Sequence, residues 1–123
     1  MLSPDVLGRL QSLHPAIASQ LEEIVRLAPE SADPQLLDLC SSYVDAALQR
    51  QDWTPPGGEM TEKESAFIAF TEQFVSSVST MSDEQVSRLQ EYASADAIYA
   101  FVNALYVADM VRRLNLVTQR VLQ

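Results

Sequence analysis

The sequence predicts an all-α fold, a single helical bundle of about six helices, from three observations. Apolar residues recur at helical spacing through most of the 123 residues, cap residues and prolines divide these stretches, and no segment alternates like a strand. The longest stretch, Ser94–Leu122, is apolar almost all the way round between Ala97 and Val111. We therefore expect this C-terminal helix to be the most buried element of the bundle.

Three helices are expected in residues 1–50. Ser3-Pro4 and Asp33-Pro34 each combine a cap residue with a proline at the first helical position, and His14-Pro15 marks a break between helices. The expected helices begin at Pro4 and end near Leu13, extend over Ala16–Leu27, and begin at Pro34 and end near Arg50.

Residues 51–60 form the expected linker, because the run Pro55-Pro56-Gly57-Gly58 cannot continue a helix. Three more helices are expected in residues 61–122. Thr61 and Ser82 each open a capping box, in which the cap residue and the third helical residue satisfy free N–H groups reciprocally, and Ser94 caps the last helix. The fourth helix extends to about Val78 with Phe67, Phe70, Phe74 and Val78 as its core stripe, and the fifth ends near Glu91.

The composition excludes several classes of partner. The net charge is −9, from 8 basic and 17 acidic residues, which argues against nucleic acid and against an anionic membrane surface. The Ala97–Val111 run is shorter than a membrane span and ends in Arg112-Arg113, so it is interpreted as core. A single Cys allows no internal disulfide, and Met1–Leu10 has no feature of a signal peptide, so a cytoplasmic location is expected.

Cys40 and His14 are the only thiol and the only imidazole in the chain. Cys40 falls on the apolar stripe of its helix, so we interpret it as a structural, buried residue with a raised pKa rather than as a nucleophile. A single His excludes a His-based metal site and argues against a His-based relay. No metal and no cofactor are expected.

Polar residues near the apolar helices are the remaining candidates for a site. Glu72 lies between Ile68 and Val75 at helical spacing, either as a general acid or base at the core edge or as a solvated residue. Asp109 precedes Arg112 and Arg113 by one turn, which predicts ion pairs that brace the core or an interface, with substrate binding as the alternative. Asn103 is expected to hydrogen-bond another helix. The side chains of Trp53, Tyr92, Tyr99 and Tyr106 either line a pocket or pack in the core.

From Glu62 to Leu116 the chain resembles the carboxymuconolactone decarboxylase and alkylhydroperoxidase-D-like superfamily. The matching features are the acidic helix start, the run Ala66–Val75, the short helix capped at Ser82, and a long apolar helix that closes on Asp109-Met110-Val111-Arg112-Arg113-Leu114. Arg113 matches the Arg of the family pattern, and Arg112 replaces its Asn. Trp53 resembles a Trp that often precedes these helices.

The resemblance implies an alkylhydroperoxidase-D-like helical domain, but this chain lacks the Cys-x-x-Cys and the His that carry the family's peroxidase chemistry. Leu36–Leu48 resembles the helix before that motif, and the chain then continues almost directly to Trp53. The basic and His residues of the decarboxylases also have no match. The resemblance therefore implies a non-peroxidatic branch of a family whose members assemble as dimers, trimers and hexamers.

Two classes of function remain open. The first is an oligomeric scaffold or partner-binding subunit, a homodimer or higher oligomer with a possible protein partner. The second is a decarboxylase-like enzyme or small-molecule binder with a carboxylate and tyrosine pocket, whose candidate residues are Glu72, Tyr99, Asp109 and Arg113. A deep pocket lined by these residues favours the second class, and an apolar interface favours the first.

Overall fold

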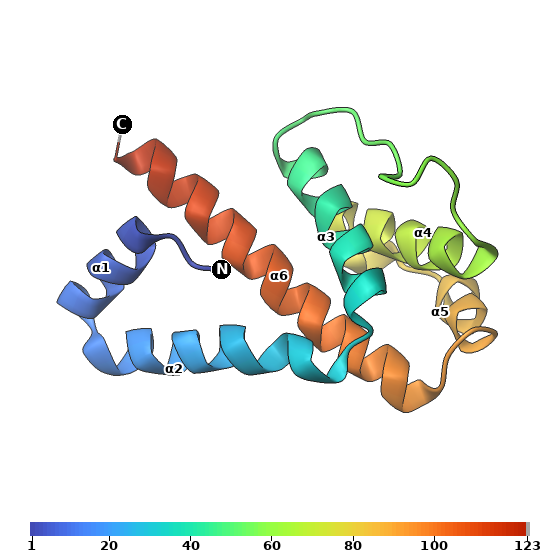
Figure 1. The fold of residues 1–123 in the computed structure, drawn as a ribbon, viewed down its shortest axis with the longest axis horizontal. Helices are drawn as coiled ribbons and strands as arrows, with labels where there is room; N and C mark the ends of the chain where they lie inside the picture. Colours follow the sequence, from blue (N-terminus) through green and yellow to red (C-terminus); the bar gives the residue numbers. More distant parts are fainter. Residues whose placement is uncertain (123) are drawn as a thin grey trace.

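The computed structural model describes residues 1–122, and over this range the chain is all-helical (Figure 1). This confirms the prediction of an all-α fold with six α-helices and no strand in the described range. The elements are α1 (Pro4–Leu13), α2 (Pro15–Leu27), the 3-10 turn η1 (Ala28–Ser31), α3 (Pro34–Leu48), α4 (Glu62–Ser76), the 3-10 turn η2 (Val78–Thr80), α5 (Asp83–Gln90) and α6 (Ala95–Val121).

The helix starts follow the local chemistry predicted from the sequence. The side chains of Ser3, Asp33 and Ser94 each accept a hydrogen bond from a backbone N–H in the first turn of their helices. Thr61 and Ser82 form complete capping boxes with Glu64 and Gln85. These caps satisfy N–H groups that have no partner inside the helix, and they fix where each helix begins.

Helix α6 joins the two groups of helices that make up the molecule (Figure 1). It passes diagonally across the picture between two groups of helices, α1 and α2 on one side and α3, α4 and α5 on the other. The larger core lies among α3, α4, α5 and α6, where the rings of Phe67 and Phe101 meet edge to face at 4.8 Å. A smaller core of Leu2, Val6 and Val111 lies between α1, α2 and the C-terminal half of α6.

Helix α6 is not buried on all sides, so the prediction that it is the most buried element is wrong. It buries five residues along its 27 positions, whereas α3 and α4 each bury five along 15. On its outer side Tyr99, Tyr106 and Val117 are 71%, 62% and 57% exposed. The helices within residues 1–122 are too few to surround α6. Apolar composition alone does not say how many neighbours a helix has.

Two further boundaries differ from the predictions. Helix α4 ends at Ser76, so Val78 lies in η2 and is 54% exposed instead of extending the core stripe. Helix α3 ends at Leu48, and Arg50 adopts a φ of 56°. The N–H groups of Arg50 and Gln51 bond back to the carbonyls of Ala47 and Ala46, which is the Schellman arrangement that terminates many helices.

Residues 51–60 cross from α3 to α4 without a helix, as predicted. Trp53 attaches this linker to α3, because its indole N–H donates to Ser42 Oγ at 3.0 Å and its ring meets Tyr43 edge to face at 5.6 Å. The hydroxyl of Ser42 in turn donates to the carbonyl of Leu39. The linker is therefore held against the core on one side of α3.

Candidate functional site

The residues predicted for a carboxylate and tyrosine pocket do not come together. Glu72 is exposed on α4, and its charge adds to the effect of burial in raising the pKa of Tyr43 on α3. Tyr99 and Asp109 both belong to α6 but lie about 15 Å apart along its axis, given a rise of about 1.5 Å per residue. Tyr99 lines an open hollow, and neither Glu72 nor Asp109 lines that hollow.

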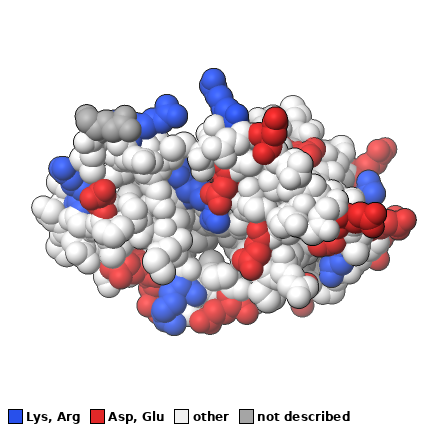
Figure 2. Space-filling model, turned by 45° about the horizontal axis from the view of Figure 1, so that its top comes forward, with Lys and Arg blue, Asp and Glu red and all other residues white. Residues whose placement is uncertain are grey.

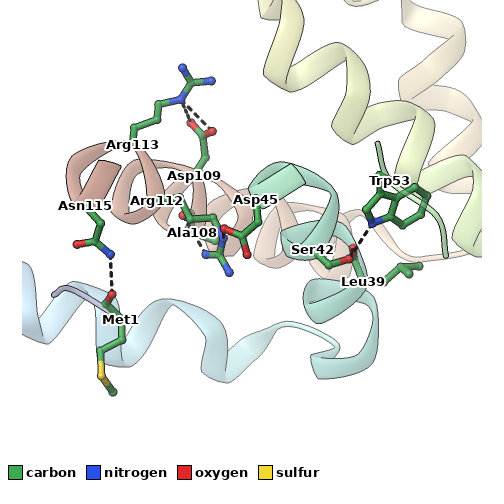
Figure 3. Close-up of polar contacts among 10 residues, drawn as sticks. All are labelled: Met1, Leu39, Ser42, Asp45, Trp53, Ala108, Asp109, Arg112, Arg113 and Asn115. Atoms are coloured by element: carbon green, nitrogen blue, oxygen red, sulfur yellow. Dashed lines mark hydrogen bonds and ion pairs between the residues drawn. The ribbon is translucent and has the colours of Figure 1, made fainter. Parts of the chain in front are cut away.

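The predicted pair of Asp109 and Arg113 is present. Arg113 Nε donates to both carboxylate oxygens of Asp109, at 3.0 and 2.9 Å, and the contact lies one turn apart on α6. The prediction that Arg112 pairs with Asp109 is wrong. Arg112 extends toward α3, with Nε 2.7 Å from Asp45 Oδ1 and Nη1 donating to the carbonyl of Ala108 (Figure 3).

Arg112 separates two small hollows at the junction of α3 and α6. One, of about 200 Å³, is lined by Asp45 and Asn115 among others. The other, of about 230 Å³, is lined by Asp38, Ser41 and mostly apolar side chains. Arg112 lines both. The guanidinium is already paired with Asp45, so it does not present a free charge to an anion in either hollow. We therefore assign Arg112 to the joining of α3 and α6.

Asn115 joins the N-terminal segment to α6. Its Nδ2 donates to the carbonyl of Met1 at 2.9 Å (Figure 3), and its Oδ1 accepts from the backbone N–H of Ser3 at 2.9 Å. Because Ser3 caps α1, this amide fixes the start of α1 beside the C-terminal half of α6. No sequence signal marked Asn115, since its partners are backbone groups at the other end of the chain.

Cys40 lies in the larger core with no exposed surface. Burial raises the pKa of its thiol to about 11, a hydrogen bond with the Thr71 side chain opposes the rise, and the charge of Glu64 adds to it. The predicted burial and raised pKa are both confirmed. A thiol with this pKa contains almost no thiolate at neutral pH, and thiolate is the reactive form.

Large exposed apolar side chains lie along the outer side of α6 and on the adjoining part of α2. We define the α6 face as Tyr99, Asn103, Tyr106, Met110, Arg113 and Val117. An open hollow of about 540 Å³ adjoins this face, and it is lined by Ile24, Leu27, Ala28, Ser31, Asp96, Tyr99, Ala100 and Asn103. Ile24 and Leu27, on the α2 side, are 50% and 43% exposed.

Asn103 and Tyr106 of this face each make a contact within the chain. The amide of Asn103 donates to the carbonyl of Tyr99 in its own helix, so the predicted hydrogen bond to another helix is wrong. The ring of Tyr106 meets Phe74 of α4 edge to face at 5.3 Å while 62% of the residue stays exposed. Exposed apolar surface of this kind is typical of sites that bind another macromolecule. The sequence analysis did not identify this face, although Tyr99, Tyr106 and Arg113 recur at a seven-residue spacing that places them on one side of a helix.

Charges are distributed unevenly over the surface. Figure 2 shows the densest group of acidic side chains at the end formed by α4 and α5, and on this face the described basic side chains form no continuous patch. The first turns of these two helices carry Glu62, Glu64, Asp83 and Glu84. Helix α6 differs, because it holds two acidic and three basic residues. Helix α6 is therefore less acidic than the end formed by α4 and α5.

Within residues 1–122, no helix is long and apolar enough to cross a membrane. No group of three or more His, Cys, Asp or Glu side chains in the same range is placed to hold a metal ion. The fold and this surface define an acidic, all-helical protein with an uncovered helix face. No family model, curated protein or solved structure matches the chain.

Proposed function

We propose that this protein is a partner-binding helical subunit without thiol peroxidase activity. The observation that carries the proposal is the α6 face with its adjoining hollow, where Tyr99 and Tyr106 hold large rings in water. Aromatic side chains are enriched in the centres of protein interfaces and lose little conformational freedom on binding. Exposed aromatic rings beside an open hollow on a small domain are best explained by a protein partner.

The proposal excludes peroxide chemistry at Cys40. The thiol is fully buried, its pKa is raised to about 11, and the chain has no second Cys to resolve a sulfenic acid. The alternative of an enzyme or small-molecule binder has less support, because Glu72 and Asp109 lie away from the hollow that Tyr99 lines. We therefore favour binding over catalysis.

We also propose that the chain is a non-peroxidatic branch of the carboxymuconolactone decarboxylase and alkylhydroperoxidase-D-like superfamily, located in the cytoplasm. Its support is the sequence pattern over Glu62–Leu116 together with an all-helical fold that ends in a long helix. The family's use of helical faces for assembly agrees with a binding role for α6.

Site-specific photocrosslinking in the native cells tests the proposed function. A photoreactive phenylalanine analogue replaces Tyr99 on the α6 face or, as the control, Val86, which is 38% exposed on α5. We expect crosslinked protein adducts from position 99 and none above background from position 86. Absence of adducts at position 99, or equal adducts at both positions, contradicts the proposal. Turnover of peroxide by the purified protein that disappears in Cys40→Ser contradicts its second part.

A further inference from the structure

We infer that the α6 face binds a second copy of this chain, with the two α6 helices packed antiparallel about a two-fold axis. This inference rests on the proposed function, because it names the partner of the same surface. Three observations support the inference. They are the spacing of residues along the face, the order of charges along α6, and the match of both patterns with an antiparallel second α6.

The first observation is the spacing. The outer side of α6 carries a series in which steps of three and four residues alternate: Asp96, Tyr99, Asn103, Tyr106, Met110, Arg113, Val117 and Arg120. Such a series forms one continuous seam along a helix and is the pattern by which two helices pack side by side. The residues that face the larger core, such as Phe101 and Leu105, lie on the opposite side of the helix. The helix therefore has one side that faces the larger core and a second seam on which Tyr99, Tyr106 and Val117 are exposed. Met110 of this seam is half-buried beside the smaller core.

The second observation is the order of charges. Asp96 stands at the start of the seam, and Arg113 and Arg120 stand toward its end. A parallel arrangement would place equal charges together, whereas an antiparallel one places Asp96 beside Arg120 of the second copy and opposes the two helix dipoles. Neither Asp96 nor Arg120 forms an ion pair within the part of the chain that the structure describes. Both groups are therefore free for a partner.

The two patterns agree on a single register. With the two-fold axis at the level of Ala108, Tyr106 faces Met110 of the second copy, and Tyr99 faces Val117. Asn103 then faces Arg113, whose guanidinium has donors beyond the Nε that binds Asp109. Each apolar residue meets an apolar one, and each contact occurs twice, so the interface is self-complementary and closes as a dimer.

The same register fills the hollow beside α6. Val121 of the second copy, which is 74% exposed in the free chain, comes to the level of Ala95 and Asp96, next to the hollow that Ile24 and Leu27 line. The net charge of −9 opposes association of two copies in general. Helix α6 itself carries three Arg and two Asp, so the contact lies where this repulsion is weakest.

Sedimentation velocity over a concentration series tests the dimer. We expect the wild-type chain to form a species of twice its 13.7 kDa mass, and Tyr106→Glu to remain monomeric because it places two carboxylates near the axis. Val86→Glu on α5 is the matched control and keeps the dimer. Circular dichroism shows whether each variant is folded, and Val117→Glu, far from the core ring of Phe74, replaces Tyr106→Glu if that variant unfolds. A wild-type chain that stays monomeric at every concentration overturns the inference.

Disulfide trapping tests the antiparallel register. In a Cys40→Ser background, we compare Tyr99→Cys and Val117→Cys separately and as an equal mixture under mild oxidation. The mixture is expected to give a crosslinked dimer, because the two positions face each other. Each variant alone is expected to give none, because its two thiols lie about 27 Å apart along the seam, far beyond disulfide reach. Crosslinking of either variant alone, or no crosslinking in the mixture, overturns the register.

Charge reversal tests independently whether Asp96 pairs with Arg120 of the second copy. Asp96→Arg and Arg120→Asp are each expected to weaken the dimer about tenfold, since each creates two like-charge contacts by symmetry. The double variant restores the opposite charges and is expected to return within about threefold of wild type. If the losses in dimer affinity of the two single variants simply add in the double variant, the pairing of Asp96 with Arg120 is overturned. Monomer in solution combined with adducts of a different protein at position 99 in cells overturns the second copy as partner but leaves the proposed function standing.

Discussion

Arg112 of α6 and Asp45 of α3 form an ion pair, with Nε 2.7 Å from Oδ1 (Figure 3). The two residues are far apart in the sequence, and their contact joins the two helices beside the larger core. Nε is buried and its N–H bond is not directed at the carboxylate, so the contact is electrostatic rather than a hydrogen bond. The same guanidinium donates through Nη1 to Ala108 of its own helix.

Removal of the pair of Asp45 and Arg112 is expected to lower the free energy of unfolding more than removal of the pair of Asp109 and Arg113. Asp45→Ala leaves a buried Nε without its counterion, and we expect it to lower the free energy of unfolding by about 1 kcal/mol, a value reduced by the 48% exposure of the Asp45 side chain. Arg113→Ala removes a pair within one helix and is expected to cost about 0.3–0.5 kcal/mol. Urea unfolding measures both. Equal losses would show that Asp45 does not join the helices.

Cys40 makes the stability of the protein dependent on pH in the alkaline range. Its pKa is raised from an ordinary 9.0 to about 11 in the folded chain, so the folded state favours the neutral thiol. This stabilisation is fully present below pH 9 and is lost as the pH rises toward 11. We expect wild type to lose about 2–3 kcal/mol relative to Cys40→Ala across that window. Urea unfolding of both proteins at several pH values measures the difference, and parallel curves would contradict it.

Asn115→Ala is expected to release the N-terminal segment from α6. The variant loses two hydrogen bonds, to Met1 and from Ser3, so we expect a cost of about 1–2 kcal/mol in unfolding free energy. Hydrogen exchange at the Ser3 amide should become much faster. Gln119→Ala, one turn further along α6, is the control and should change stability by less than about 0.5 kcal/mol. Unchanged exchange at Ser3 would show that Asn115 does not hold the segment.

Arg50→Gly is expected to stabilise the protein. Arg50 has a φ of 56° at the end of α3, a conformation in which a side chain is strained and glycine is not. Relief of this strain exceeds the extra freedom that glycine brings to the unfolded chain, so we expect a gain of about 0.5–1 kcal/mol. Gln49→Gly, at an ordinary φ of −93°, should give no gain. Thermal unfolding of the two variants side by side measures the contrast.

The candidate site was predictable only in part. The pair of Asp109 and Arg113 was predicted because both residues lie on one helix, where spacing fixes their separation. The partner of Arg112 was not, because Asp45 is on another helix and no spacing rule relates the two. Tyr99 was named for a pocket with Glu72, and it instead belongs to an exposed face of α6. That difference depends on which sides of α6 other helices cover.

The sequence by itself determined where each helix begins and which stripe of each short helix is apolar. Caps such as Thr61 act within four residues of chain, and the 3.6-residue period places side chains on faces without reference to the rest of the molecule. Only the tertiary structure decided which apolar faces are covered. Phe101 and Tyr106 have similar rings on the same helix, yet one is 2% and the other 62% exposed. Phe101 lies in the core that α3 and α4 share with α6, whereas Tyr106 contacts the ring of Phe74 and otherwise faces away from the helices of the described chain.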